Sequence, residues 1–156
     1  GLPNPSRSGY CGRWNALLRG GAMSATEFKL QLDKEWAATV DDIAEEVAII
    51  GLKILSRTVL KTPVDTGRAK GNWIVSFGVP DPMTDITSMD KKGVAAINEG
   101  ANKLGTYPDT LPMVYIQNNL PYANRLENGW SGKAPQGMLG LSVAEVQAML
   151  AGGKDV

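Results

Sequence analysis

The chain has 156 residues, 43% of them hydrophobic, and its 16 lysines and arginines balance its 16 aspartates and glutamates. This length and apolar fraction predict one domain with a sizeable core, and the balanced charge argues against a dedicated nucleic-acid binder and against a disordered chain. Histidine is absent and cysteine occurs once, which excludes Ser-His-Asp and Cys-His catalysis, histidine-ligated zinc and an intrachain disulfide.

Residues 1–23 differ in composition from the rest of the chain. Their three arginines have no acidic counterpart, and glycine, proline, serine and asparagine dominate the first ten positions. Two interpretations stay open: a leader from a vector or from upstream translation, with Met23 as the natural start, or a basic arm that orders on binding a partner or a DNA backbone. The sequence shows neither a signal peptide nor an apolar run of about 20 residues, so no targeting or membrane segment is predicted.

A long helix is predicted from Ser24 to Leu60. Ser24 and Glu27 match a capping box at its start, and Pro63 disfavours helical geometry at the residue before it. At 1.5 Å per residue such a helix is about 55 Å long, which is more than a compact domain of this size needs. We therefore expect either a kink near Gly51 or a contact between part of the helix and a neighbouring subunit.

Apolar residues recur along this helix at spacings of three and four, which indicates a face buried in the core. The main stripe, which we expect to pack over the strands, comprises Phe28, Leu32, Trp36, Val40, Ile43, Val47, Ile50 and Ile54. A second line widens the stripe in the later half and comprises Ala37, Ala44, Ala48, Leu52, Leu55 and Val59. Charged side chains occupy the opposite face.

Shorter elements follow the long helix. Asp65 is expected to bond its own downstream backbone in a turn, and Gly67 to take a positive φ there. The expected strands are 72–79 and 111–117, the expected helices are 88–104, a single turn at 122–128 and 138–150, and the expected loops are 81–89 and 129–137. Together these elements predict an α+β fold in which the long helix packs on a small, mainly antiparallel sheet, with one or two further short helices.

Two groups of residues are candidates for metal or nucleophilic chemistry. Asp41 and Glu45 lie one helical turn apart and could chelate a cation, but no third ligand is near, so a solvated helix face is the favoured interpretation. Cys11 has no histidine partner that could activate it as a nucleophile. The stretch 129–133 lacks the glycine spacing of a phosphate-binding loop.

A third group carries aromatic rings next to cations, a combination that can stack on single-stranded nucleic acid. Its members are Tyr107, Tyr115, Tyr122, Lys103 and Arg125. The zero net charge favours core or interface roles for these side chains instead.

Two segments resemble the minor tail and head–tail joining proteins of tailed bacteriophages, a family that includes the lambda-like tail completion protein. The first motif, residues 62–73, reads Thr-Pro-Val-Asp-Thr-Gly-Arg and then Gly-Asn-Trp directly behind the long helix. The second motif, residues 118–138, contains an Asn-x-x-Pro-Tyr-Ala turn, a Leu-Glu-x-Gly step and an Ala-Pro-x-Gly-Met segment. Order and spacing both match, and the resemblance covers about residues 24–150.

The resemblance implies a structural virion protein with no catalysis, cofactor or metal. Family members are small α+β proteins that assemble as rings at the neck, so a homo-oligomeric ring, six copies on a sixfold tail tube, is expected. Its implied partners are the adjacent connector or adaptor, the tail tube or terminator, and double-stranded DNA that passes through the lumen; no membrane is involved. The implied location is the virion, after assembly in the host bacterial cytoplasm.

The resemblance also assigns assembly residues and an organisation. Behind the leader or arm at 1–23, which the resemblance does not cover, it implies a single tail-component domain at 24–156, whose loop at about 80–110 varies among such proteins and is expected to dock on an adjacent ring. The residues carried by the two motifs are Pro63, Asp65, Gly67, Arg68, Trp73, Asn118, Pro121, Tyr122, Leu126, Glu127, Gly129, Trp130, Pro135, Gly137 and Met138.

Specific roles follow as hypotheses. Four residues are expected to anchor the second motif, either in the core or at a subunit contact: Tyr122, Leu126, Trp130 and Met138. Glu127 is expected to form an ion pair with Arg68 or Arg125. Three rival interpretations remain: a tail-terminator or connector ring of the same neck, a nucleic-acid-binding protein that uses the basic leader and the aromatic group, and an enzyme built on the helix carboxylates.

Overall fold

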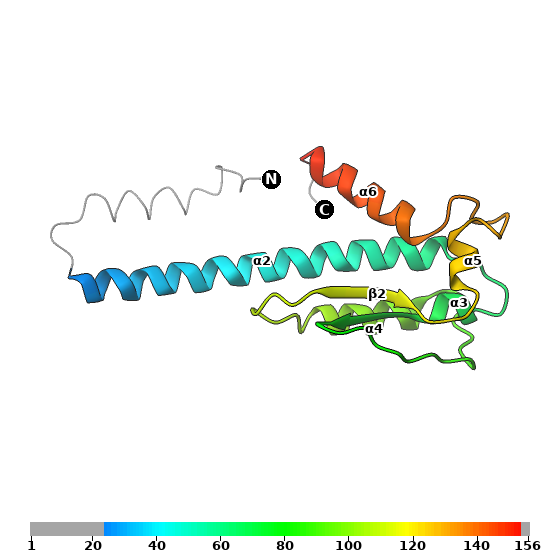
Figure 1. Ribbon diagram of the computed structural model, residues 1–156, viewed down its shortest axis with the longest axis horizontal. Helices are drawn as coiled ribbons and strands as arrows, with labels where there is room; N and C mark the ends of the chain where they lie inside the picture. The colour runs from blue at the N-terminus through cyan, green and yellow to red at the C-terminus, as the bar shows by residue number, and fades with distance from the viewer. Residues whose placement is uncertain (1–23, 154–156) are drawn as a thin grey trace. The chain divides into compact units, whose positions relative to one another are not determined.

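The computed structural model describes residues 24–153, so the predicted leader and Cys11 lie outside the described residues. The fold is α+β, as predicted (Figure 1). Its elements in chain order are α2 (Ala25–Lys61), α3 (Arg68–Gly71), β1 (Trp73–Phe77), α4 (Val94–Leu104), β2 (Val114–Asn118), α5 (Ala123–Glu127) and α6 (Leu139–Ala151). The chain divides within α2 into two compact units, a first unit, Gly1–Asp41, and a second unit, Asp42–Val156.

The described part of the first unit is the start of α2. The backbone N–H of Ser24 donates to Glu27 Oε2 at 3.1 Å, and the N–H of Glu27 donates to Ser24 Oγ at 3.2 Å, which confirms the capping box. The apolar stripe expected in the core is nevertheless exposed here: Phe28, Leu32 and Trp36 keep 49%, 44% and 69% of their surface accessible. The prediction that the main stripe is core is therefore wrong for these residues.

In the second unit, the line predicted only to widen the stripe forms the buried face of α2. Leu55 and Val59 are fully buried, and Ala48 and Leu52 pack beside them. The main stripe is less buried here, since Ile43 is exposed and Val47, Ile50 and Ile54 are half-buried. The hydrophobic core comprises Leu55, Val59, Trp73, Val75, Ala96, Leu104, Ala134 and Met138.

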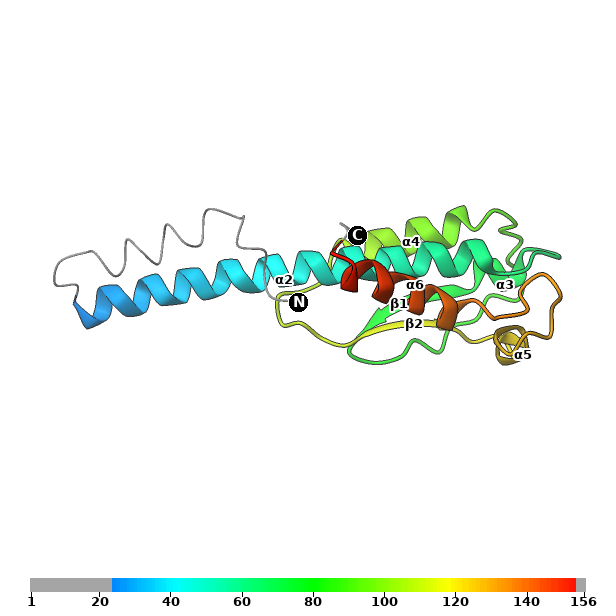
Figure 2. The ribbon, with the colours of Figure 1, turned by 90° about the horizontal axis from the view of Figure 1, so that it is seen from above.

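α2 continues as one helix through Gly51, where a kink was one of two expectations. Gly51 is buried, and a Cβ there would lie 3.0 Å from a methyl group of Leu104 in α4. Gly100 of α4 is placed more tightly still, because its Cβ would overlap the side chain of Leu55. Small residues thus let α2 and α4 pack closely along the second unit (Figures 1 and 2).

β1 and β2 form a two-stranded antiparallel sheet in which Trp73 pairs with Asn118 and Phe77 with Val114. Trp73 and Val75 point into the core from one face of β1. β2 begins three residues later than expected, since Leu111 has a φ of 53°, which is outside the extended range.

The predicted helix 88–104 begins later, at Val94. Gly93 precedes it in a left-handed conformation, and the Asp90 carboxylate accepts hydrogen bonds from the N–H groups of Val94 at 3.1 Å and Ala96 at 3.2 Å. Ala96 is buried in the core. The segment expected to be a variable docking loop therefore contains a core helix.

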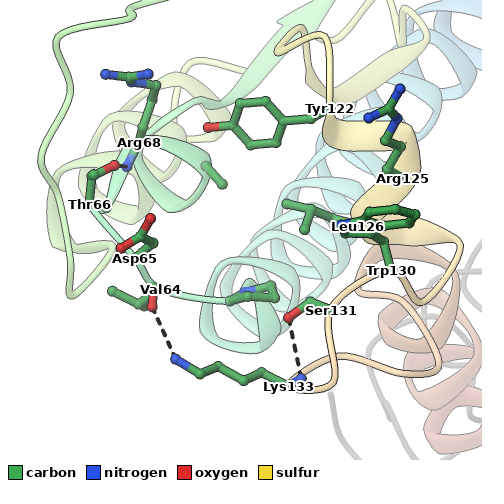
Figure 3. A pocket seen from close by; sticks show the side chains of 13 residues that line it. Val64, Asp65, Thr66, Arg68, Tyr122, Arg125, Leu126, Trp130, Ser131 and Lys133 are labelled. Atoms are coloured by element: carbon green, nitrogen blue, oxygen red, sulfur yellow. Dashed lines mark hydrogen bonds between the residues drawn. The ribbon is translucent and has the colours of Figure 1, made fainter.

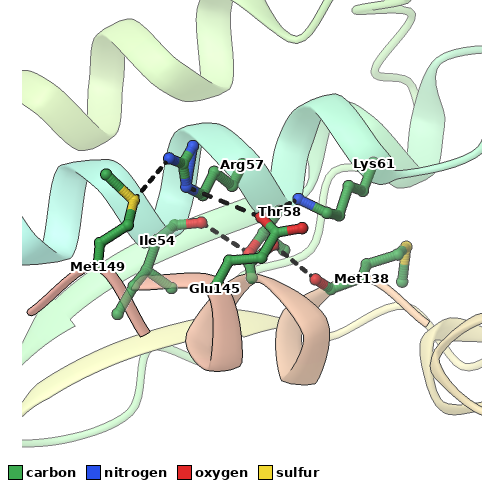
Figure 4. A network of polar contacts seen from close by, with 8 residues as sticks. Ile54, Arg57, Thr58, Lys61, Met138, Glu145 and Met149 are labelled. Carbon is green, nitrogen blue, oxygen red and sulfur yellow. Dashed lines mark hydrogen bonds and ion pairs between the residues drawn. The ribbon is translucent and has the colours of Figure 1, made fainter. Parts of the chain in front are cut away.

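The predicted closing helix is present as α6 and lies along the second-unit part of α2 (Figure 4). The Glu145 carboxylate is 2.7 Å from Lys61 Nζ and 3.8 Å from Arg57 Nε. Thr58 and Ser142 are fully buried, and each hydroxyl donates to the carbonyl four residues earlier, Ile54 and Met138 respectively, at 2.7 Å. These local bonds satisfy both hydroxyls in the buried interior.

Candidate functional site

The two sequence motifs meet in space at one end of the sheet. Asn118 Nδ2 donates to the Ala69 carbonyl at 2.8 Å, which ties the start of the second motif to the first. Together the motifs line a pocket of about 600 Å³, the motif pocket (Figure 3). Its lining comprises Pro63, Val64, Asp65, Thr66, Gly67, Arg68, Ala69, Tyr122, Arg125, Leu126, Trp130, Ser131 and Lys133.

A buried hydrogen-bond chain fixes the first motif to the end of α2. Trp73 Nε1 donates to Thr62 Oγ1 at 2.8 Å, and this hydroxyl donates to the Thr58 carbonyl at 2.7 Å. Trp73 and Thr62 are 6% and 2% exposed, so both polar groups depend on this pairing. Pro63, which follows Thr62, then lines the motif pocket.

The turn between Pro63 and α3 has the predicted backbone but a different side-chain bond. Gly67 has a φ of 93°, and a Cβ there would lie 2.6 Å from the backbone nitrogen of Lys91. The hydroxyl of Thr66 accepts a hydrogen bond from the Arg68 N–H at 3.3 Å, the bond expected of Asp65. Asp65 is exposed and points into the motif pocket (Figure 3).

The loop predicted at 81–89 is present and mostly exposed, and asparagines hold it against the motifs. Asn72 Nδ2 donates to the Asp85 carbonyl, and Asn72 Oδ1 accepts from the Asp85 N–H, both at 2.7 Å. Asn119 Nδ2 donates to the carbonyls of Asp81 and Met83 at 2.7 Å. Both asparagines lie within the sequence motifs, but the motif spacing does not predict that they bind the loop after β1.

Glu127 caps α6 and forms neither ion pair that was predicted. Its carboxylate accepts the N–H groups of Met138 and Leu139 at 3.0 Å and of Gly140 at 2.9 Å. Within residues 24–153, no ion pair joins it to Arg68 or Arg125, and its two oxygens are paired with three backbone donors instead. Partial burial alone raises the pKa of Glu127, but the three N–H donors outweigh it and hold the pKa below its ordinary value.

Two glycines close the second motif. Gly129 and Gly137 both have a φ of 81°. A Cβ on Gly129 would lie 2.5 Å from the Pro135 carbonyl oxygen, and one on Gly137 would lie 2.4 Å from that of Glu127. Only a residue without a side chain fits either position, which accounts for their place in the motif. Pro121 and Pro135 are exposed in the turns around them.

The four expected anchors of the second motif divide into core and surface. Met138 is 1% exposed in the core, and Leu126 packs against the same cluster. Tyr122 is half-buried and lines the pocket. Trp130 is 78% exposed, so its expected core alternative is wrong and the contact alternative stays open.

Trp130 is held in place despite its exposure. Its backbone N–H donates to the Arg125 carbonyl at 3.0 Å, and the Arg125 guanidinium carbon lies 5.8 Å from the centre of its ring. Exposed cation–π pairs of this kind contribute about 0.5–1 kcal/mol. The local structure thus presents a large aromatic ring to solvent in a defined orientation.

The motif pocket is cationic. Arg68, Arg125 and Lys133 line it together with a single carboxylate, Asp65. Lys133 Nζ donates to the Val64 carbonyl at 3.3 Å, whereas Arg68 Nε is buried and has no hydrogen-bond partner among the described residues. An acidic or aromatic group of another molecule would complement this lining.

Within the described residues, Asp41 and Glu45 gain no third ligand, and the stacking group is not brought together. Among the described residues, no three side chains suited to a metal gather around Asp41 and Glu45 or elsewhere. Tyr107 donates to the Pro112 carbonyl at 2.6 Å and stacks edge-on against Phe77, at the opposite end of the sheet from Tyr122. Burial raises the pKa of Tyr107. The five-residue stacking group predicted from the sequence is therefore not one surface.

Comparisons with known protein families, curated proteins and solved structures find no match to this chain. Over residues 24–153, no helix is long and apolar enough to cross a membrane.

Proposed function

We propose that this chain is a structural protein of the neck of a tailed bacteriophage. In this proposal its copies form a ring that completes the tail and joins it to the head connector, while double-stranded DNA passes through the lumen. The observation that carries the proposal is that both motifs resembling this family converge on one pocket and tie it together, from Asn118 to Ala69. Two motifs that are about 45 residues apart in the chain are expected to occur together if both are needed to build one surface.

The division of labour within the motifs supports an assembly role. One group of motif residues holds the backbone: Trp73 and Asn118 through hydrogen bonds, Glu127 through the cap of α6. The motif residue Trp130 and the neighbouring Arg125 are left facing solvent on that rigid base. Exposed tryptophan and arginine side chains on a fixed base are the residue types that dominate protein–protein contacts.

The first unit supports the same proposal independently of the motifs. Phe28, Leu32 and Trp36 recur every four residues and therefore line one side of α2, where they stay exposed. A row of large exposed apolar side chains marks a surface that another protein covers. A subunit contact was one of the two expectations raised by the length of this helix.

Native mass and electron microscopy test the proposal. The purified chain, alone and mixed with purified tails of the phage that encodes it, should form a ring of discrete mass with a lumen wide enough for duplex DNA. A chain that stays monomeric and also fails to bind those tails contradicts the proposal. Binding that requires free DNA and weakens steeply with salt would point instead to the nucleic-acid-binding alternative.

A further inference from the structure

The exposed face of α2 in the first unit and the motif pocket in the second unit both present large aromatic side chains to solvent. We propose that they are the two sides of one contact: the α2 face of one copy binds the motif pocket of a second copy. This inference rests on the proposed function, because it specifies how the ring subunits join.

Both surfaces expose large apolar side chains. The α2 face presents Phe28, Leu32 and Trp36, each at least 44% exposed. The pocket presents Trp130 at 78% exposure, with Tyr122 half-buried beside it. Each aromatic ring buries about 150–250 Å² when covered, so a contact between these surfaces removes a substantial apolar area from water.

The charges of the two surfaces are opposite. Counted over all sides of the helix, residues 24–41 carry four carboxylates against two lysines, whereas the motif pocket carries three cations against one carboxylate. Asp33, exposed and three residues before Trp36, lies next to it on the helix surface. A carboxylate beside an aromatic ring suits a pocket in which Arg125 stands over Trp130. Opposite charges favour contact between an α2 face and a pocket over contact between two α2 faces or between two pockets.

The proposed contact is heterologous, since it joins two different surfaces of the same chain. One copy then keeps an unused pocket and the other an unused α2 face, so further copies add in the same way. Such head-to-tail contacts generate a ring when the rotation closes. A contact between two identical surfaces would stop at a dimer.

A complementation experiment tests the contact. One variant removes the α2 face (Phe28→Ser with Trp36→Ser), and another removes the pocket aromatic and cation (Trp130→Ser with Arg125→Ser). The control removes two exposed apolar residues outside both surfaces (Val79→Ser with Met113→Ser), which are 70% and 66% exposed. Circular dichroism and thermal unfolding verify that all three variants fold.

Native mass spectrometry gives the readout. Each surface variant alone should need a concentration about tenfold or more above that of the wild type to assemble, and the control should assemble like the wild type. Mixed in equal amounts, the two surface variants should form a dimer containing one of each and nothing larger, because only one intact pair of surfaces remains.

Several outcomes overturn the inference. If the wild type assembles and either surface variant does so equally well, the contact is wrong while the proposed ring stands. If both variants stay monomeric and their mixture does too, the two surfaces do not bind each other. A wild type that is monomeric at all concentrations rejects a second copy as the occupant. Binding of that monomer to purified tails then decides the proposed function separately.

Discussion

α2 behaves differently in the two units of the molecule. In residues 24–41 its large apolar side chains are exposed, with Trp36 at 69%. In residues 42–61 the same helix buries Leu55 and Val59 completely against the sheet and α4. The periodicity is continuous across both parts, yet a different line of residues is buried. A helical pattern therefore identifies faces, and the elements packed against the helix determine which face becomes core.

Leucine truncation gives the largest contrast between the units. Leu55→Ala should lower the free energy of unfolding by about 2–5 kcal/mol, because it opens a cavity at a fully buried site. Leu32→Ala, at a site 44% exposed, should change it by less than about 0.5 kcal/mol. Urea denaturation at a concentration where the chain is monomeric measures both. Equal losses would contradict the burial difference.

Tryptophan substitution gives the next contrast. Trp73→Phe should cost about 1–3 kcal/mol, since it removes the indole N–H that donates to the buried Thr62 hydroxyl. Trp36→Phe should stay within about 0.5 kcal/mol, because Trp36 is 69% exposed. Thermal unfolding followed by circular dichroism separates the two. A Trp73→Phe variant as stable as the wild type would show that the buried bond contributes nothing.

Each unit also has a glutamate that caps a helix. Glu127→Gln should cost about 1–3 kcal/mol, because an amide cannot accept the three N–H groups at the start of α6 without turning a donor toward one of them. Glu27→Gln should cost less than about 0.5 kcal/mol, since glutamine also serves in a capping box. Urea titrations of both variants provide the comparison. Similar losses in the two would indicate that the α6 cap has no special role.

The pH dependence is the smallest expected effect. The pKa of Glu127 is lower in the folded chain than in the unfolded chain, where it is about 4.3. Its stabilisation is therefore complete above that unfolded value and is lost as the pH falls through the folded pKa. Stability measured from pH 6 to pH 3 should fall more steeply for the wild type than for Glu127→Gln. Asp85, whose pKa the Thr87 hydroxyl also lowers, acts equally in both proteins and cancels. Parallel curves would exclude Glu127 as the titrating group.

The local turns of the candidate site were predictable from the sequence, but the partners and the exposure of its side chains were not. Gly67, with its positive φ, and the single helical turn before Gly129 follow from local rules and are confirmed. The predicted ion pair of Glu127 is wrong, because its donors come from a segment eleven to thirteen residues later, which folds back only in the tertiary structure. The exposure of Trp130 was equally open in the sequence, since a tryptophan beside a turn suits either a core or a contact.

The sequence by itself determined the α+β class, the capped start of α2, the closing helix and the turn glycines, because these depend on interactions within a few residues of chain. Only the tertiary structure decided which line of α2 is buried, which carboxylate caps α6, and that residues 63–69 and 122–133 share a pocket. Burial and hydrogen-bond pairing depend on segments that are distant in the chain. The periodicity of one helix does not say which distant segment packs against each of its faces. That is the physical reason for the division.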